Sequence, residues 1–241
     1  MQTIRSFIFW VSFVTWTTFI TVPFCFLWVC PRRWLVKHLN WWARGVMWLL
    51  KITVNVRYEI LGREFMPDGP ALIVSNHQSA WDTIIFHVLC ADPCFVMKRV
   101  LFWIPFYGLH ALKMGMVGIS RGKNGATSWK NMLRKIPSRL KRGQAVIIFP
   151  EGTRVRPGEW RDYHSGAFHV ARCVWQDSAL QTCPVIPAAL DSGKCWPRNS
   201  WTLWPGVIRL RFLPAIPRGL GRAEFMRHLE ESIRTAQSRL D

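Results

Sequence analysis

The stretch NHQSAWD at residues 76–82 contains a histidine and an aspartate five positions apart, His77 and Asp82. Residues five apart lie on opposite faces of a strand, and about 140° apart around a helix, so neither element would bring these side chains together. An apolar run, ALIVS, precedes the stretch and a helical pattern follows it. This order predicts a strand-to-helix bend in which Asp82, in the first helical turn, reaches one imidazole nitrogen. A carboxylate so placed fixes the tautomer and raises the basicity of the other nitrogen, as a general base requires.

The pair by itself leaves other interpretations open. A histidine satisfied within a turn, with Asp82 serving only as a helix cap, fits the same two residues. Ser79 is a candidate nucleophile, but a side chain two residues from His77 in one tight turn is poorly placed for proton transfer to it. A metal site is not expected, because no further ligands occur at a recognised spacing.

Two further polar groups follow apolar runs. The first comes after AVIIF and consists of Pro150, Glu151, Gly152, Thr153 and Arg154; the second comes after MVGIS and contains Arg121 and Lys123. Proline ends a strand ladder, glycine lets the backbone approach a ligand, and arginine offers a planar fork for phosphate. An ordinary polar turn also fits each group alone. Because ligands bind at the carboxyl ends of strands in an open α/β sheet, we predict that the three groups share one site.

The pattern from residue 54 onward predicts an α/β fold, with a mixed, largely parallel sheet flanked by helices. Strands are predicted at residues 54–62, 71–75, 94–98, 116–120, 145–149, 185–190 and 207–213. Helices are predicted near residues 81–90, 126–142, 165–175 and 222–240. Pro137 lies within the second helical pattern and predicts a kink or a split there.

The amino-terminal segment differs in composition from the rest of the chain. Between Arg5 and Arg32 lie 26 residues without a charge, which as a helix would be long enough to cross the hydrocarbon core, with a kink at Pro23. Residues 34–56 are amphipathic and predict an interfacial helix or the return arm of a re-entrant hairpin. We therefore predict a membrane-anchoring helical hairpin at residues 1–53 and a catalytic domain at residues 54–241. A buried pair of core helices is the alternative.

Charge and aromatic content indicate an anionic partner. The formal net charge is +18, and the first 58 residues contain no acid but seven of the fifteen tryptophans. Tryptophan mixed with arginine favours a membrane interface over nucleic acid. Residues 93–150 also contain no acid, while eleven Lys and Arg occur at residues 98–142. Such a region suits a phosphomonoester ligand and equally suits contact with anionic lipid. The seven cysteines form no CxxC pair and predict reduced thiols.

Together these residues resemble the glycerolipid acyltransferase family, which includes the 1-acyl-sn-glycerol-3-phosphate (lysophosphatidate) acyltransferases. The four blocks of the family occur in order: the NHxxxxD block with Asn76, His77 and Asp82, GISR ending at Arg121, FPEGTR at residues 149–154, and CPVIPAAL around Pro187. The second block departs from the family, because its middle position is more often bulky and apolar.

The resemblance implies a glycerol-3-phosphate acyltransferase-like fold and a reaction without a cofactor. A fatty acyl group would pass from acyl-CoA or acyl-carrier protein to the sn-2 hydroxyl of lysophosphatidic acid, giving phosphatidic acid. His77 would act as the base and Asp82 would orient it. The implied substrate-binding residues are Lys98, Arg121, Glu151, Gly152, Thr153 and Arg154. Residues 196–217 resemble bacterial members, which implies a bacterial inner-membrane enzyme whose catalytic domain faces the cytoplasm.

Two alternatives remain at this stage. The acceptor could be another lysolipid, such as lyso-ornithine lipid, because the same blocks occur in such relatives. From a different class, a non-catalytic basic protein that binds membranes would also explain the charge, but it would not explain the polar groups at predicted strand ends.

Overall fold

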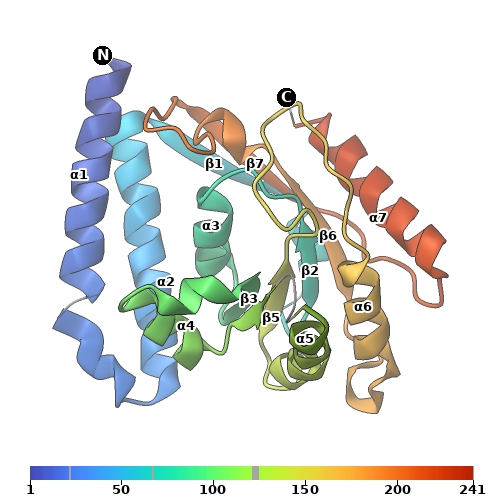
Figure 1. The fold of residues 1–241 in the computed structure, drawn as a ribbon. Helices are drawn as coiled ribbons and strands as arrows, with labels where there is room; N and C mark the ends of the chain where they lie inside the picture. Colours follow the sequence, from blue (N-terminus) through green and yellow to red (C-terminus); the bar gives the residue numbers. More distant parts are fainter. Residues whose placement is uncertain (22, 67, 121–124, 241) are drawn as a thin grey trace.

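A computed structural model describes residues 1–21, 23–66, 68–120 and 125–240, in which one sheet lies between two helical layers (Figure 1). The strands are β1 (Val56–Leu61), β2 (Leu72–Ser75), β3 (Pro93–Lys98), β4 (Val117–Ile119), β5 (Ala145–Ile148), β6 (Val185–Leu190) and β7 (Gly206–Phe212). Their order across the sheet is β1-β7-β6-β2-β5-β3-β4. Neighbours are parallel except β6 and β7, which pair antiparallel. The predicted mixed, largely parallel sheet is confirmed.

The central strands explain why the sequence shows short, continuous apolar runs. Every residue of β2, β5 and β6 is buried, because helices cover both faces of the sheet. The parallel direction places the carboxyl ends of β2, β3, β4 and β5 at one edge. That edge is where the sequence places its polar groups.

Helices form the two outer layers. On one face lie α1 (Gln2–Thr21), α2 (Arg32–Leu49), α3 (Trp81–Leu89) and α4 (Tyr107–Met114), and on the other α5 (Gly125–Leu140), α6 (Gly166–Gln176) and α7 (Arg222–Gln237) (Figure 1). Shorter turns of helix are η1 (Pro23–Trp28), η2 (Leu50–Val54), η3 (Arg63–Phe65), η4 (Arg99–Trp103), η6 (Ser178–Leu180) and η7 (Ser192–Lys194). Two separate apolar clusters, one on each face, form the core.

The prediction of a break at Pro137 needs correction in part. Pro137 lies inside α5, which runs from Gly125 to Leu140 without a split. Proline cannot donate a hydrogen bond to the carbonyl four residues earlier, at Leu133. The thiol of Cys173 on α6 donates to that carbonyl instead, with 3.5 Å between Sγ and O. A neighbouring helix thus supplies the missing donor, and the last helical turn continues past the proline.

The uncharged amino-terminal run is interrupted where the sequence predicts a kink. α1 ends at Thr21 and the chain continues as η1 from Pro23. α2 then returns beside α1. The Trp16 indole donates to the Trp42 carbonyl at 3.2 Å. A Cβ at Gly45 would lie 2.3 Å from the Trp16 ring, so only glycine allows this close helix packing.

The outer side of α1 is apolar and exposed. More than half of the surface of each of Ile4, Phe7, Val11 and Val14 is exposed. By length and composition α1 could cross a membrane, and it is the single such helix among the described residues. A membrane role for residues 1–53, and the predicted domain boundary after residue 53, stay predictions.

Candidate active site

The bend between β2 and α3 brings His77 and Asp82 together. Nδ1 of His77 lies 2.7 Å from Oδ2 of Asp82. The first residue before the helix, Ala80, provides no side-chain cap, and the Asp82 carboxylate points back to the bend rather than to the N–H groups of α3. Asp82 therefore holds the histidine, which favours the general-base interpretation over a helix cap.

Asp82 is fully buried, and hydrogen bonds occupy both of its oxygens. The backbone N–H groups of Gln78 and Ser79 donate to Oδ2 at 2.7 and 2.9 Å. The hydroxyl of Ser192, after β6, donates to Oδ1. These donors replace the water that a buried carboxylate loses, and they fix its orientation.

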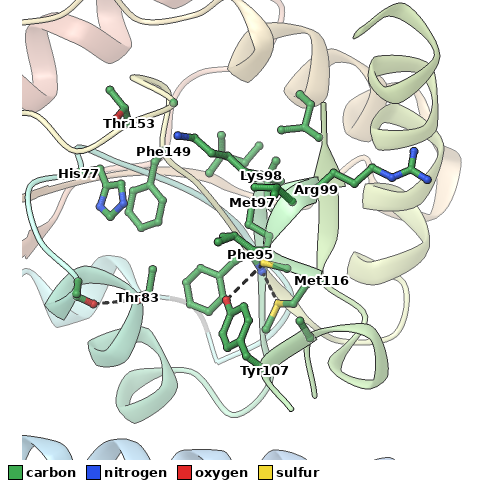
Figure 2. A pocket seen from close by; sticks show the side chains of 18 of the residues that line it. His77, Thr83, Phe95, Met97, Lys98, Arg99, Tyr107, Met116, Phe149 and Thr153 are labelled. Carbon is green, nitrogen blue, oxygen red and sulfur yellow. Dashed lines mark hydrogen bonds between the residues drawn. The ribbon is translucent and has the colours of Figure 1, made fainter. Parts of the chain in front are cut away.

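The His77 ring is held between its aspartate and an aromatic face. Phe149 stacks on the imidazole, with ring centroids 4.1 Å apart and an angle of 17° between the planes (Figure 2). The His77 side chain is 16% exposed, and it lines a cavity. Since Asp82 accepts from Nδ1–H, Nε2 is the nitrogen left to accept a proton from a bound ligand.

Ser79 is not placed to act as a nucleophile. Its side chain is fully buried in the bend, and its hydroxyl accepts from the backbone N–H of Trp81 at 3.2 Å. It helps to form the bend that Asp82 closes.

Glu151 lies behind His77. Its Oε2 accepts from the backbone N–H of His77 at 2.7 Å, and only 6% of the residue is exposed. The pKa of Glu151 is raised to about 8, mainly because the carboxyl is buried; the hydrogen bond from the His77 N–H opposes this rise, and the nearby Asp82 carboxylate adds to it. This position supports the expected role in shaping the bend, and direct binding of an acceptor stays a prediction.

The remaining residues of FPEGTR form a turn at the end of β5. Gly152 has φ +63°, a left-handed conformation that favours glycine, and its N–H donates to the Phe149 carbonyl at 3.0 Å. Arg198 donates from Nη1 to the Arg154 carbonyl at 2.6 Å. The turn thereby places Gly152, Thr153 and Arg154 on the wall of the cavity that His77 lines.

The cavity measures about 1390 Å³ and changes character along its length. Its polar end contains His77, Lys98, Thr153, Arg154 and Arg198, and its apolar part extends past Ile84, Phe95, Ala111 and Met114 to Leu39 and Trp42. Figure 2 shows Lys98 extending toward the His77 and Phe149 side, whereas the neighbouring Arg99 points away. The arrangement can hold an anionic headgroup beside a base and an alkyl chain in the interior.

Arg121 and Lys123 lie outside the described residues. Ser120, the last described residue after β4, lines the same cavity. The sequence prediction that polar groups after β2 and β5 converge is therefore met for His77, Thr153 and Arg154, together with Lys98 at the end of β3. The prediction for Arg121 stays a prediction.

Sequence reasoning missed several supporting residues. Ser192 follows β6, so the strand-end rule applied to a fourth strand could have found it. Asn76 belongs to a recognised block, but its role emerged only in three dimensions: its amide donates to the Leu190 carbonyl at 2.9 Å and accepts from the Leu190 N–H at 2.8 Å. It thus joins the ends of β2 and β6 beneath the site.

Comparison with known proteins agrees with this geometry. Residues 57–191, more than half of the chain, match the Acyltransferase family. The chain belongs to this acyltransferase family. The match includes the His77 bend, the FPEGTR turn and β6, so the shared region is the one that forms the site.

The chain is similar to several named acyltransferases. It is 32% identical over 175 residues to a 1-acyl-sn-glycerol-3-phosphate acyltransferase of Pseudomonas aeruginosa, covering 73% of this chain and 65% of that protein. It is 28% identical over 170 residues to the human 1-acyl-sn-glycerol-3-phosphate acyltransferase alpha, covering 70% and 58%. It is 31% identical over 161 residues to the lyso-ornithine lipid O-acyltransferase of Rhizobium meliloti, covering 67% and 51%. The chain thus spans less than two thirds of each of these relatives.

A solved structure shares the fold over the whole chain. The crystal structure of the 1-acyl-sn-glycerophosphate (LPA) acyltransferase PlsC from Thermotoga maritima superposes with a TM-score of 0.77. The alignment covers 100% of this chain and 99% of that chain, at 22% sequence identity. The amino-terminal helical pair and the α/β layer are therefore parts of one shared architecture.

Proposed function

We propose that the chain transfers a fatty acyl group from acyl-CoA or acyl-carrier protein to the sn-2 hydroxyl of lysophosphatidic acid, giving phosphatidic acid. The observation that carries the proposal is the His77–Asp82 pair at the polar end of a cavity whose other end is apolar. Similarity to named 1-acyl-sn-glycerol-3-phosphate acyltransferases supports the choice of acceptor.

The chemistry follows from the geometry of His77. Nε2 accepts the proton of the acceptor hydroxyl while the oxygen attacks the thioester carbonyl. Asp82 keeps the proton on Nδ1 and stabilises the imidazolium that forms. The carbon–sulfur bond then breaks, and the imidazolium returns its proton to the departing thiolate. An ester and a free thiol result, with no acyl-enzyme.

The cations at the polar end suit the phosphate of the acceptor. Lys98 and Arg154 line the cavity, and we include Arg121 as a third phosphate ligand from its place in the sequence. An arginine can bind a phosphate through two parallel hydrogen bonds, which would also fix the direction of the hydroxyl.

We also propose that the protein works at a bacterial inner membrane with its α/β layer toward the cytoplasm. The exposed apolar side of α1 supports membrane contact. Arg32, Arg33 and Lys37, at the start of α2, support a cytoplasmic position for the turn between the helices.

A lyso-ornithine lipid acceptor is the second candidate, favoured by 31% identity to the Rhizobium meliloti enzyme. Such an acceptor lacks the phosphomonoester that would use Arg154 and Lys98 as a pair. A non-catalytic basic membrane-binding protein is disfavoured, because it would have no use for a buried aspartate that orients a cavity-lining histidine.

A panel of acceptors and donors tests the proposal. Purified full-length protein in mild detergent should transfer acyl groups to lysophosphatidic acid faster than to lyso-ornithine lipid or lysophosphatidylcholine. His77→Ala should lower kcat by about 10³-fold or more, since general-base catalysis and positioning are lost together. Undiminished turnover by His77→Ala would rule out the proposed base. Preference for a phosphate-free acceptor would overturn the assignment to phosphatidic acid synthesis.

A further inference from the structure

The segment from η4 through α4 exposes apolar side chains on its outer side. Trp103 is 84% exposed, Leu112 56% and Ile104 47%. We define the η4–α4 patch as the exposed side chains of Trp103, Ile104, Leu109 and Leu112, which are not among the residues that line the cavity. Contiguous apolar surface of this kind marks a contact with another molecule or with a membrane.

The same segment forms a wall of the cavity. Leu101, Pro105, His110 and Met114 line the cavity that contains His77, and Figure 2 shows Tyr107 projecting toward Phe95. A thin layer of protein, apolar on both sides, therefore separates the cavity from the outside.

A strained turn connects η4 to α4. Phe106 has φ +60° and ψ −52°, and the Tyr107 N–H donates to the Pro105 carbonyl at 2.6 Å. Such a turn is rare for a residue with a side chain, and a conformation of this kind costs about 1–3 kcal/mol. Nδ1 of His110 lies 2.6 Å from the Phe106 carbonyl oxygen and supports the turn.

α4 is also tied to the turn between α1 and α2. The Lys113 ammonium donates to the carbonyls of Leu27, Trp28 and Cys30. Arg32 donates to the Lys113 carbonyl at 3.2 Å. The exposed side chains of Phe26, Trp28 and Val29 in that turn therefore lie next to the η4–α4 patch. The apolar surface extends from the helical hairpin onto the α/β layer.

The charge around the patch indicates what covers it. Residues 93–150 contain no acid, and the flanking Lys98 and Arg99 are exposed. Tryptophan and aliphatic side chains beside lysine and arginine match the boundary between acyl chains and anionic headgroups. We propose that the η4–α4 patch is a membrane-contacting surface of the α/β layer itself, distinct from α1, and that it inserts into an anionic leaflet. The cavity wall would then face hydrocarbon, so that a lysolipid reaches His77 from within the leaflet; only this last step rests on the proposed function.

A label that reports on polarity tests the contact without measuring activity. An environment-sensitive fluorophore is attached to the thiol introduced by Trp103→Cys. Trp160→Cys is the matched control, because Trp160 is also exposed, at 51%, but packs against Arg234 of α7, away from the η4–α4 patch. The parent chain, treated in parallel, gives the background of the native thiols. With phosphatidylglycerol-containing vesicles we expect a blue shift, a several-fold rise in emission and quenching by lipid-borne nitroxides at position 103, and none of these at position 160.

A second pair of variants tests the consequence for the substrate. Trp103→Glu should lower the rate on long-chain acceptor in vesicles by about tenfold, because a charge replaces an inserted aromatic ring. It should leave the rate on a short-chain, water-dispersed acceptor close to that of the parent chain, and Trp160→Glu should leave both rates unchanged.

The outcomes separate the two proposals. Absence of acyl transfer by the parent chain would defeat the proposed function and leave the fluorescence result standing. A position-103 label that stays in a water-like environment on vesicle-bound protein would overturn the membrane contact. A spectral change that grows with protein concentration without vesicles would also overturn it, because the patch would then cover a second copy of the chain.

Discussion

The His77 bend and the η4–α4 wall line the same cavity but are built in opposite ways. In the bend, Asp82 is fully buried and hydrogen bonds reach both of its oxygens. In the wall, Trp103, Leu109 and Leu112 are exposed, and a strained turn at Phe106 connects η4 to α4. Proton transfer demands fixed atoms, so the bend is rigid and satisfied. Contact with a lipid demands an exposed apolar surface, and the wall provides one.

The largest effect on the rate should come from a substitution in the His77 bend. Asp82→Asn keeps the volume but removes the charge, and it presents an amide that can offer a donor where the His77 Nδ1–H needs an acceptor. We expect kcat to fall by about 10³-fold, measured as initial rates of acyl transfer to lysophosphatidic acid, with circular dichroism to confirm folding.

Ser79→Ala is the control for that experiment, since Ser79 lies in the same bend. It loses one hydrogen bond to the Trp81 N–H and should retain kcat within about fivefold. A loss as large as that of Asp82→Asn would revive Ser79 as a nucleophile and contradict direct attack by the acceptor.

Arg154 should affect binding more than chemistry. Arg154→Ala removes a fork for the acceptor phosphate, so we expect KM for lysophosphatidic acid to rise by about 10- to 100-fold with a small change in kcat. Arg156→Ala is the control. It removes the same guanidinium group, but from a side chain that is 73% exposed and lies 3.9 Å from Glu159. Equal effects of the two variants would mean that general charge, rather than a phosphate site, attracts the acceptor.

A substitution of Ser192 tests whether a residue after β6 also helps to hold Asp82 in place. Its hydroxyl donates to the oxygen of Asp82 that does not hold His77, so Ser192→Ala should loosen the carboxylate and lower kcat by about tenfold. Substitution of the exposed Ser138 on α5 is the control. The pH–rate profile separates positioning from destabilisation, because a loosened aspartate should change the shape of the profile, whereas a folding defect should lower the rate equally at every pH.

The same contrast explains what the sequence could reveal. Parallel strands end at one edge, so the polar groups after β2 and β5 could be predicted to meet, and the core strands and four helices of the α/β layer follow from local patterns. Ser192 could have been found by the same rule. The η4–α4 wall could not, because α4 has only eight residues, and Trp103 of η4 and Leu109 and Leu112 of α4 resemble core positions. Apolar residues predict burial, and the sequence alone does not distinguish burial in protein from exposure to lipid.

Two prolines show the same limit. The sequence predicts a kink at Pro23, and there α1 ends at Thr21 and η1 begins at Pro23. Pro137, by contrast, lies inside α5 without splitting it, and the Cys173 thiol on α6 donates to the Leu133 carbonyl, which proline leaves without its usual donor. A proline fixes the local backbone, but the sequence pattern alone does not show whether the helix continues past it.

The last expected effect concerns stability rather than rate, and it falls on Glu151, which lies behind His77. Burial raises its pKa from 4.5 in the unfolded chain to about 8 in the folded protein. Between these values the folded protein holds a proton that the unfolded chain has released, so the free energy of unfolding should fall as pH rises from about 4.5 to about 8. The fall should be of the order of a few kcal/mol, since one pKa unit corresponds to ~1.4 kcal/mol.

Glu151→Gln keeps an acceptor for the His77 N–H but cannot titrate, so its unfolding free energy should depend less on pH across that window. Denaturant unfolding of both proteins in mild detergent, at several values from about pH 5 to about pH 9, measures the difference. Parallel curves for the two proteins would show that Glu151 is ionised throughout. A neutral Glu151 would matter for catalysis too, because a second buried negative charge close to Asp82 would favour a permanently protonated His77, and a protonated imidazole cannot accept the hydroxyl proton.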